Sequence, residues 1–72
     1  MNRKLLASQV EEELMNYILQ EPVNVGDKIP NEFDLAEKFG VGRSTIRETV
    51  KSLVSKGVLE VRRGDGTYVI ST

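Results

Sequence analysis

The apolar residues of this 72-residue chain recur with two different periods. Residues 8–20, 31–39 and 43–55 carry apolar side chains three and four positions apart, which is the period of an amphipathic α-helix. Residues 59–70 instead alternate apolar and polar side chains around a glycine-rich turn, which is typical of a β-hairpin. The order helix, helix, helix, hairpin predicts a mainly α fold with a small β-hairpin (α+β). The apolar positions that define the helices are Val10, Leu14, Tyr17, Ile18, Leu35, Ala36, Phe39, Ile46, Val50, Leu53 and Val54.

Capping signals predict where these helices begin and end. A capping-box sequence predicts that the first helix starts at Ser8, and Pro22 ends it. Asn31, with an aspartate three residues later, predicts the start of the second helix, and Gly40 predicts a left-handed residue just after it. The connector between the first two helices could form a short strand at residues 28–29.

Length and composition restrict the classes of function. The 72 residues make one domain, 1–72, with a modest core, because a chain of this size buries only about 60% of its unfolded surface. The absence of Cys and His excludes disulfides, Cys–His metal sites and Cys or His nucleophiles. We therefore expect no enzymatic activity, no cofactor and no metal. No apolar run approaches the roughly 18 residues that a membrane helix needs, so we expect a cytoplasmic protein.

The charge is unevenly distributed along the chain. The formal net charge is −1, which by itself argues against binding a polyanion. Residues 1–40 carry a net charge of −4, however, whereas residues 41–72 carry +3. Because opposite charges attract, a nucleic acid would meet the second half of the chain.

The second and third predicted helices are spaced as a helix-turn-helix. Their short connection favours a steep crossing, and the second helix of such a pair enters the DNA major groove by its N-terminal residues. Arg43, Arg47 and Lys51 project from one face of this helix, opposite its apolar stripe. Ser44 and Thr45 lie in its first turn, where hydroxyls and backbone amides can hold phosphate. We predict a recognition helix over about residues 43–55.

The hairpin of residues 59–70 has the features of a wing. Arg62 and Arg63 stand just before a tip that contains Gly64 and Gly66. Glycine lets the backbone approach a phosphate or a groove closely, and an arginine beside such a tip is suited to a narrow minor groove. We therefore expect the wing at the minor groove.

Other interpretations of the same residues remain open at this point. The cations of the third helix could be a solvated face paired with Glu48, and the hairpin could be an ordinary β-turn with basic flanks. A winged helix used only for protein–protein contact is the alternative function. The clustering of arginines with the glycine tip favours DNA.

Residues 26–69, GDKIPNEFDLAEKFGVGRSTIRETVKSLVSKGVLEVRRGDGTYV, resemble the signature of the GntR family. That signature reads loosely pG-LPSE-LA, GVSR-TVREAL, L-GL and RRGxGTFV. The resemblance implies a winged helix-turn-helix, three helices plus a wing, that binds operator DNA as the N-terminal head of a bacterial transcription regulator. It assigns base or phosphate contacts to the recognition helix and a close approach to the wing tip. The DNA-binding candidates are Asn31, Glu32, Arg43, Ser44, Thr45, Arg47, Lys51, Arg62, Arg63, Gly64 and Gly66.

Two positions depart from the family pattern. Phe33 stands where many members carry a DNA-contacting Arg, and we expect it to pack on the domain instead. Gly42 replaces the usual Ser or Thr before the recognition helix, which keeps an acceptable N-cap but removes a hydroxyl–phosphate contact.

The resemblance also implies partners beyond DNA. Family members usually form homodimers that bind inverted repeats, with their heads about one helical turn, roughly 34 Å, apart. They carry a C-terminal effector domain, so we expect this chain to be either a truncated piece or a stand-alone head, with a small-molecule effector bound elsewhere.

Overall fold

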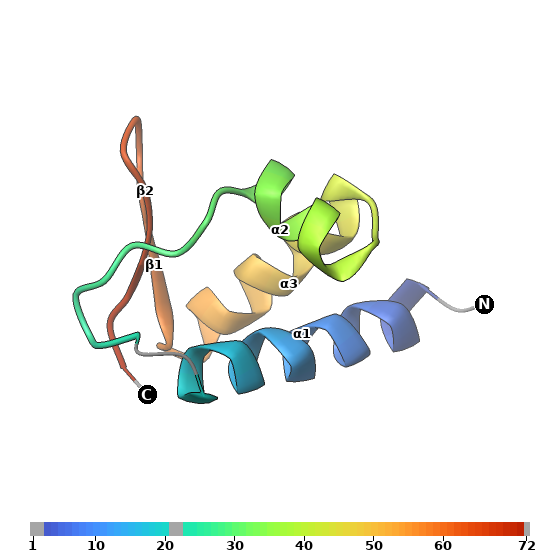
Figure 1. The fold of residues 1–72 in the computed structure, drawn as a ribbon, viewed down its shortest axis with the longest axis horizontal. Helices are drawn as coiled ribbons and strands as arrows, with labels where there is room; N and C mark the ends of the chain where they lie inside the picture. Colours follow the sequence, from blue (N-terminus) through green and yellow to red (C-terminus); the bar gives the residue numbers. More distant parts are fainter. Residues whose placement is uncertain (1–2, 21–22, 72) are drawn as a thin grey trace.

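The structure, a computed structural model, describes residues 3–20 and 23–71 of the chain. It contains helices α1 (Arg3–Gln20), α2 (Glu32–Phe39) and α3 (Arg43–Ser55), followed by strands β1 (Leu59–Arg62) and β2 (Gly66–Val69). Figure 1 shows α3 lying between α1 and α2, with the hairpin rising at the end of the molecule far from the N-terminus. This is the winged helix-turn-helix that the sequence predicts. No helix in the described ranges is long and apolar enough to span a membrane.

The helix-turn-helix forms with the caps expected from the sequence. The side chain of Asn31 accepts a hydrogen bond from the backbone N–H of Asp34, at 2.8 Å. Gly40 adopts the left-handed conformation, φ 68° and ψ 36°, which suits a residue without a Cβ. Gly42 is the N-cap of α3 and makes no side-chain cap bond. These caps place α3 immediately after a tight turn, at the predicted residues.

Helix α1 begins earlier than the sequence prediction. It starts at Arg3 rather than Ser8, and Ser8 lies exposed within the helix. Leu6 packs against the core, so burial of an apolar side chain extends the helix toward its N-terminus, and no breaker precedes Ser8. The predicted stop at Pro22 lies outside the described residues, and α1 ends at Gln20.

The core lies where the three helices and the hairpin meet. Helix α3 buries Ile46 and Leu53 as predicted, but Val54 remains 40% exposed. Thr45 and Thr49 are buried in its place, because the stripe of α3 that faces α1 is rotated toward them. The buried apolar side chains are Val10, Leu14, Ile18, Ile29, Leu35, Ala36, Ile46, Leu53, Leu59 and Val69.

Thr49 is satisfied as a buried polar residue. Its hydroxyl donates to the carbonyl of Thr45 at 2.9 Å and lies 3.5 Å from the carbonyl oxygen of Ala7 in α1. A buried hydroxyl needs such a partner to offset its loss of water.

The hairpin is anchored by the connector that precedes α2. Strand β2 covers Gly66–Val69 within the predicted hairpin of residues 59–70, and Gly66 pairs with Arg62. Ile29 donates its N–H to the carbonyl of Thr67 at 2.9 Å, and Lys28 forms an isolated antiparallel bridge to Tyr68. The short strand predicted at residues 28–29 thus exists as this single bridge.

Candidate nucleic-acid interface

The outer face of α3 carries the predicted cations. Arg43, Ser44, Arg47 and Lys51 are all exposed, while the opposite face packs into the core. Among the described residues, no carboxylate forms an ion pair with Arg43 or Lys51. Helix α3 is therefore a platform with one buried face and one cationic face.

Thr45 does not belong to this exposed face. Only 8% of the residue is accessible, and its carbonyl accepts the Thr49 hydroxyl. This burial gives no support to the predicted DNA contact of its side chain, which stays a prediction. In the first turn of α3, the exposed hydroxyl belongs to Ser44.

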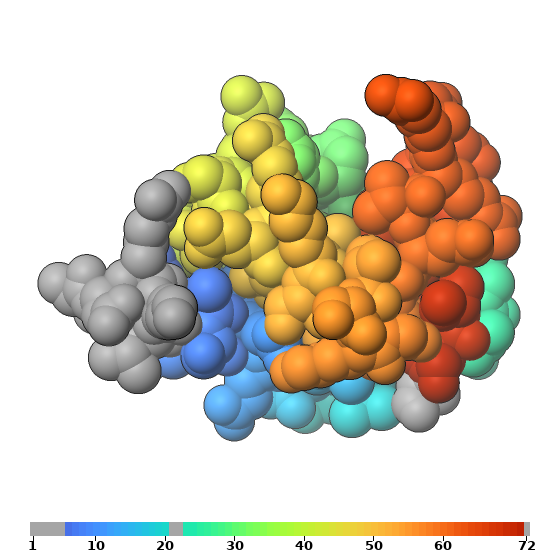
Figure 2. Space-filling model, turned by 180° about the vertical axis from the view of Figure 1, so that it is seen from behind, coloured from blue at the N-terminus to red at the C-terminus, as the bar shows by residue number. Residues whose placement is uncertain are grey.

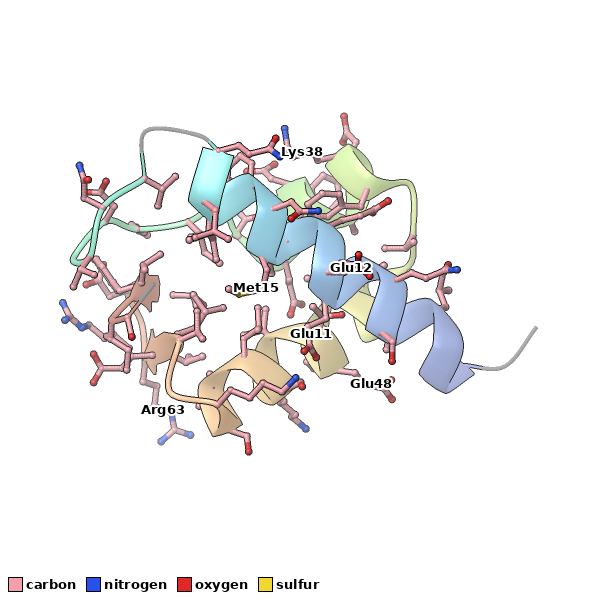
Figure 3. All side chains as sticks on the ribbon, turned by 90° about the horizontal axis from the view of Figure 1, so that it is seen from below. Glu11, Glu12, Met15, Lys38, Glu48 and Arg63 are labelled. Carbon is pink, nitrogen blue, oxygen red and sulfur yellow. The ribbon has the colours of Figure 1, made fainter. Side chains whose placement is uncertain are left out.

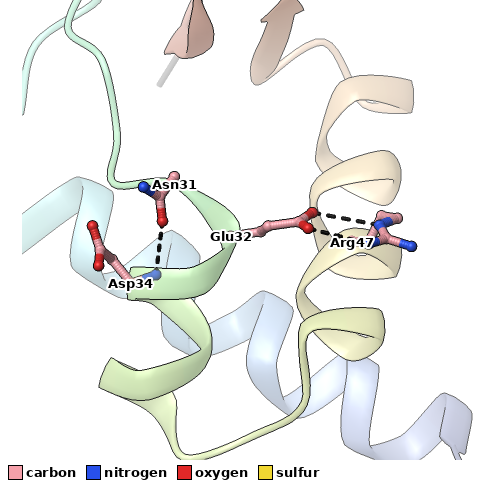
Figure 4. A network of polar contacts seen from close by, with 4 residues as sticks. All are labelled: Asn31, Glu32, Asp34 and Arg47. Atoms are coloured by element: carbon pink, nitrogen blue, oxygen red, sulfur yellow. Dashed lines mark hydrogen bonds and ion pairs between the residues drawn. The ribbon is translucent and has the colours of Figure 1, made fainter.

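A carboxylate from α2 holds Arg47. The Nε and NH2 groups of Arg47 donate to the two carboxylate oxygens of Glu32, at 3.4 and 3.1 Å (Figure 4). This hydrogen bonding lowers the pKa of Glu32 from its usual 4.5, and the positive charge of Arg43 adds to the effect. The sequence interpretation that paired the α3 cations with Glu48 is thus wrong for Arg47. The pair fixes the guanidinium while its NH1 group makes no hydrogen bond within the described part of the chain.

The two arginines of the wing have different surroundings. Arg62 lies over the ring of Tyr68, 4.2 Å from the centroid, and its Nε is 3.3 Å from Glu60. Arg63 is exposed and forms no ion pair with a described residue, and Figure 3 shows it on the outer side of the hairpin, away from α1. Gly64, beside it at the tip, has φ of 76°, a conformation that favours glycine.

Helix α3 and the wing border one groove. Figure 2 shows the surface hollowed between the wing and the adjoining parts of α2 and α3. The groove has a volume of about 840 Å³, and Arg47 and Lys51 line it together with Val61 and Thr67 of the hairpin and Lys28 of the connector. Two candidate elements, which follow one another in the sequence, therefore border a shared surface.

Five of the eleven predicted site residues line this groove. Asn31, Glu32 and Gly66 line it together with Arg47 and Lys51. The others fall outside the residues that line the groove: Arg43, Ser44, Thr45, Arg62, Arg63 and Gly64. They belong to the start of α3 or to the end of β1 and the turn that follows it.

Lys28, Val61 and Asp65 line the groove but were not among the predicted site residues. Lys28 lines the groove, and Val61 exposes 58% of its surface there, although both were treated only as parts of strands. Phe33 is also 58% exposed at the start of α2, so the expectation that it packs on the domain is wrong. The alternation of β1 could not have revealed Val61, because a period of two places it on the same face as the buried Leu59.

The opposite side of the molecule differs in charge. Figure 3 views this side, where Glu11 and Glu12 lie on α1. Lys56 forms an ion pair with Glu11, and Lys38 lies over the ring of Tyr17 at 5.0 Å. The described residues contain no group of three or more His, Cys, Asp or Glu side chains that could hold a metal ion.

The chain matches one family of proteins. The sequence profile described as "Bacterial regulatory proteins, gntR family" matches residues 6–69. The Uxu operon transcriptional regulator of Escherichia coli (strain K12) is 40% identical over 57 residues, which cover 79% of this chain and 22% of the relative. The HTH-type transcriptional repressor NanR of Enterobacter sp. (strain 638) is 38% identical over 67 residues, which cover 93% of this chain and 26% of the relative.

Solved structures with the same fold include DNA complexes. A GntR protein of Streptococcus agalactiae is 51% identical, with a TM-score of 0.85 over 90% of this chain and 32% of its own. AraR(DBD) in complex with operator ORE1 is 42% identical, with a TM-score of 0.82 over 89% of this chain and 78% of its own. The chain spans between 14% and 29% of the length of six curated relatives that it matches.

Proposed function

The chain belongs to the gntR family of bacterial regulatory proteins, and we propose on that premise that it binds double-stranded operator DNA as the reading head of a transcription regulator. One observation carries the proposal. Cations of α3 and residues of the wing line the same groove. A duplex that placed α3 in its major groove would present the neighbouring minor groove to the wing, with the backbone between them in this groove.

Base reading falls to the start of α3 in this proposal. Arg43 and Arg47 reach the guanine O6 and N7 atoms, the commonest specific contact that an arginine makes. Glu32 holds Arg47 in place for that contact, since its carboxylate occupies the Nε side of the guanidinium. Ser44, exposed in the first turn, donates to a phosphate, where the backbone amides of a helix start also favour an anion.

Phosphate contacts are distributed around the groove. Lys51 and Lys28 line it and are more suited to phosphate than to base edges, because an ammonium is a point charge without a planar fork. Arg62, Arg63, Gly64 and Gly66 bring the wing to the minor groove. Each phosphate that is neutralised releases counterions, so affinity should fall steeply as the salt concentration rises.

The proposal extends to the working form of the full protein. We place it in the cytoplasm, as a homodimer on an inverted repeat with heads roughly 34 Å apart. Effector binding is assigned to a C-terminal domain of the kind that the family resemblance implies. The chain acts by binding, not as an enzyme.

The proposal is tested by selection and by a double variant. Duplexes are first selected from a random pool with the wild-type chain, which yields the operator and its symmetry together. The variant Arg43→Ala/Arg47→Ala is then compared with the wild type on the selected duplex. Its control is Lys38→Ala/Lys56→Ala, which removes two positive charges from residues that do not line the groove.

The proposal expects the arginine variant to stay folded and to lose the selected duplex. The control should bind nearly as the wild type does, apart from a small non-specific loss. Equal losses in both variants would mean that only net charge matters. Unchanged binding by a folded arginine variant, or a flat salt dependence, would favour the protein–protein alternative.

A further inference from the structure

The tip of the wing carries a carboxylate on the surface that we propose meets DNA. Asp65 lies in the turn between β1 and β2 and lines the groove together with Arg47 and Lys51. Its side chain is 54% exposed. A negative charge at this place repels a phosphate backbone, so attraction to DNA does not explain why an aspartate stands at position 65.

Two side chains contact the carboxylate of Asp65. The hydroxyl of Tyr68 donates to Oδ2 of Asp65 at 2.7 Å, and the ammonium of Lys28 lies 3.6 Å from Oδ1. The hydrogen bond from Tyr68 lowers the pKa of Asp65 from its usual 3.8, and Lys28 and Arg62 act in the same direction. Asp65 therefore joins the wing tip to the connector and to the second strand of the hairpin.

Gly66 makes room for the contact with the connector. A Cβ atom at position 66 would collide with Cε of Lys28 in its present position. The lysine side chain thus passes directly over the Gly66 backbone on its way to Asp65. The glycine that the sequence assigns to the wing tip also clears this path.

Tyr68 connects Asp65 to an arginine. Its hydroxyl binds Asp65, and its ring lies against the guanidinium of Arg62 at 4.2 Å. A tyrosine held at its hydroxyl end cannot turn freely, so it offers Arg62 a fixed surface. The network of Lys28, Asp65, Tyr68 and Arg62 therefore spans the wing from connector to arginine.

We propose that Asp65 is a positioning residue that fixes the wing tip and gives the protein preference for its operator over other duplexes. The proposal rests on the proposed DNA-binding function. The carboxylate weakens general attraction to a polyanion and in return holds Arg62 and the tip in one arrangement. Binding that depends on groove shape needs such a fixed arrangement, whereas binding to any duplex needs only positive charge.

The variant Asp65→Asn separates the two effects. Removal of a negative charge should leave the affinity for random duplex equal or higher. Loss of the network should lower the affinity for the selected operator, so the ratio of operator to random affinity falls about five- to tenfold, within the range of a single lost specific contact. The control Glu48→Gln removes an exposed carboxylate of α3 that has no ion pair with a described residue, and it should leave this ratio unchanged.

The variant Tyr68→Phe tests the network without changing any charge. It removes only the hydroxyl that binds Asp65 and keeps the ring under Arg62. The ratio of operator to random affinity should fall here too. In the double variant Asp65→Asn/Tyr68→Phe, the fall expressed as a free energy should be smaller than the sum of the falls in the two single variants.

Footprinting on the operator distinguishes positioning from simple stability. Hydroxyl-radical protection where the wing lies should weaken in Asp65→Asn, while guanine N7 protection under α3 persists. An operator affinity that rises as much as the random affinity in Asp65→Asn, or protection that is unchanged, would overturn the role of Asp65 alone. A wild-type chain without operator preference would overturn the proposed function itself, which separates the two failures.

Discussion

Helix α3 and the wing hold their candidate DNA-binding side chains by different means. Helix α3 is seated on the core through Ile46 and Leu53, which are no more than 1% exposed. The wing buries only Leu59 and Val69 at its base, and its tip depends on a polar network that includes Asp65. One element is positioned by packing and the other by surface contacts.

This difference indicates a division of labour. Close packing resists displacement, so the arginines of α3 meet DNA from a fixed platform. Solvent-exposed ion pairs and hydrogen bonds are individually weak and are screened by salt, so the network holds the wing tip less firmly than packing holds α3. We therefore expect α3 to dominate affinity and the wing to refine the preference for one site.

The largest expected effect comes from truncating a buried side chain of α3. Ile46→Ala should lower the free energy of unfolding by about 2–5 kcal/mol, the usual cost of truncating a buried Ile, and a domain of this size has little to spare. Val61→Ala in the wing, at a position that is 58% exposed, should change it by less than about 0.5 kcal/mol. Chemical denaturation of both variants measures the contrast, and equal losses would remove the distinction between the elements.

The next effect compares one arginine from each element. Arg47→Ala should weaken operator binding about five- to 150-fold, the range for a lost bidentate guanine contact. Arg63→Ala should weaken operator and random duplexes by a similar, smaller factor if it contacts phosphate. Titrations of both variants at several salt concentrations measure these losses. A larger loss of operator affinity in Arg63→Ala than in Arg47→Ala would reverse the proposed division of labour.

A smaller effect concerns the carboxylate that holds Arg47. Glu32→Gln keeps the shape of the side chain but removes its charge, so Arg47 is held less firmly. We expect operator preference to fall by a smaller factor than in Arg47→Ala, and random-duplex affinity to rise slightly because a negative charge is lost from the groove. Competition titrations with random duplex measure both, and unchanged preference would show that Arg47 needs no partner.

The smallest effect lies on the side away from the groove. Hydrogen bonds from Lys56 and Ser52 lower the pKa of Glu11 below its usual 4.5, so the folded state is favoured when Glu11 is ionised. Glu11→Gln should cost about 0.2–1 kcal/mol at pH 7. That difference should vanish as the pH falls through the lowered folded pKa, because both side chains are then neutral. Thermal unfolding from pH 7 down to pH 3 checks this, and operator binding at pH 7 should not change.

The sequence predicts the local features of this molecule well. The caps at Asn31 and Gly40 and the bounds of α3 depend on neighbouring residues, and the structure confirms all of them. The structure also confirms the helical spacing of the apolar residues in α1, although the start of this helix depends on the packing of Leu6 against the core. Contacts between residues that are far apart in the sequence could not be predicted from the hydrophobic pattern.

The candidate site shows the same limit. Helical period alone did not separate Thr45 from Ser44, because the exact rotation of α3 is set by its contact with α1. Glu32 and Arg47 are 15 residues apart and meet only through the crossing of α2 and α3. Lys28 and Asp65 meet only because the connector lies beside β2. These pairs come from tertiary structure, which no periodicity encodes.

The placement of the two elements on DNA is the central claim, and tethered cleavage tests it most directly. The sequence has no cysteine, so Ser44→Cys and Arg63→Cys each offer one attachment point for an iron chelate that cuts nearby DNA. On the selected operator, we predict a major-groove pattern of cuts, offset toward the 5′ side between strands, from position 44. Position 63 should give the minor-groove pattern, offset toward the 3′ side, about half a helical turn away. Minor-groove cutting from position 44, or no localised cutting from either position, would contradict the account.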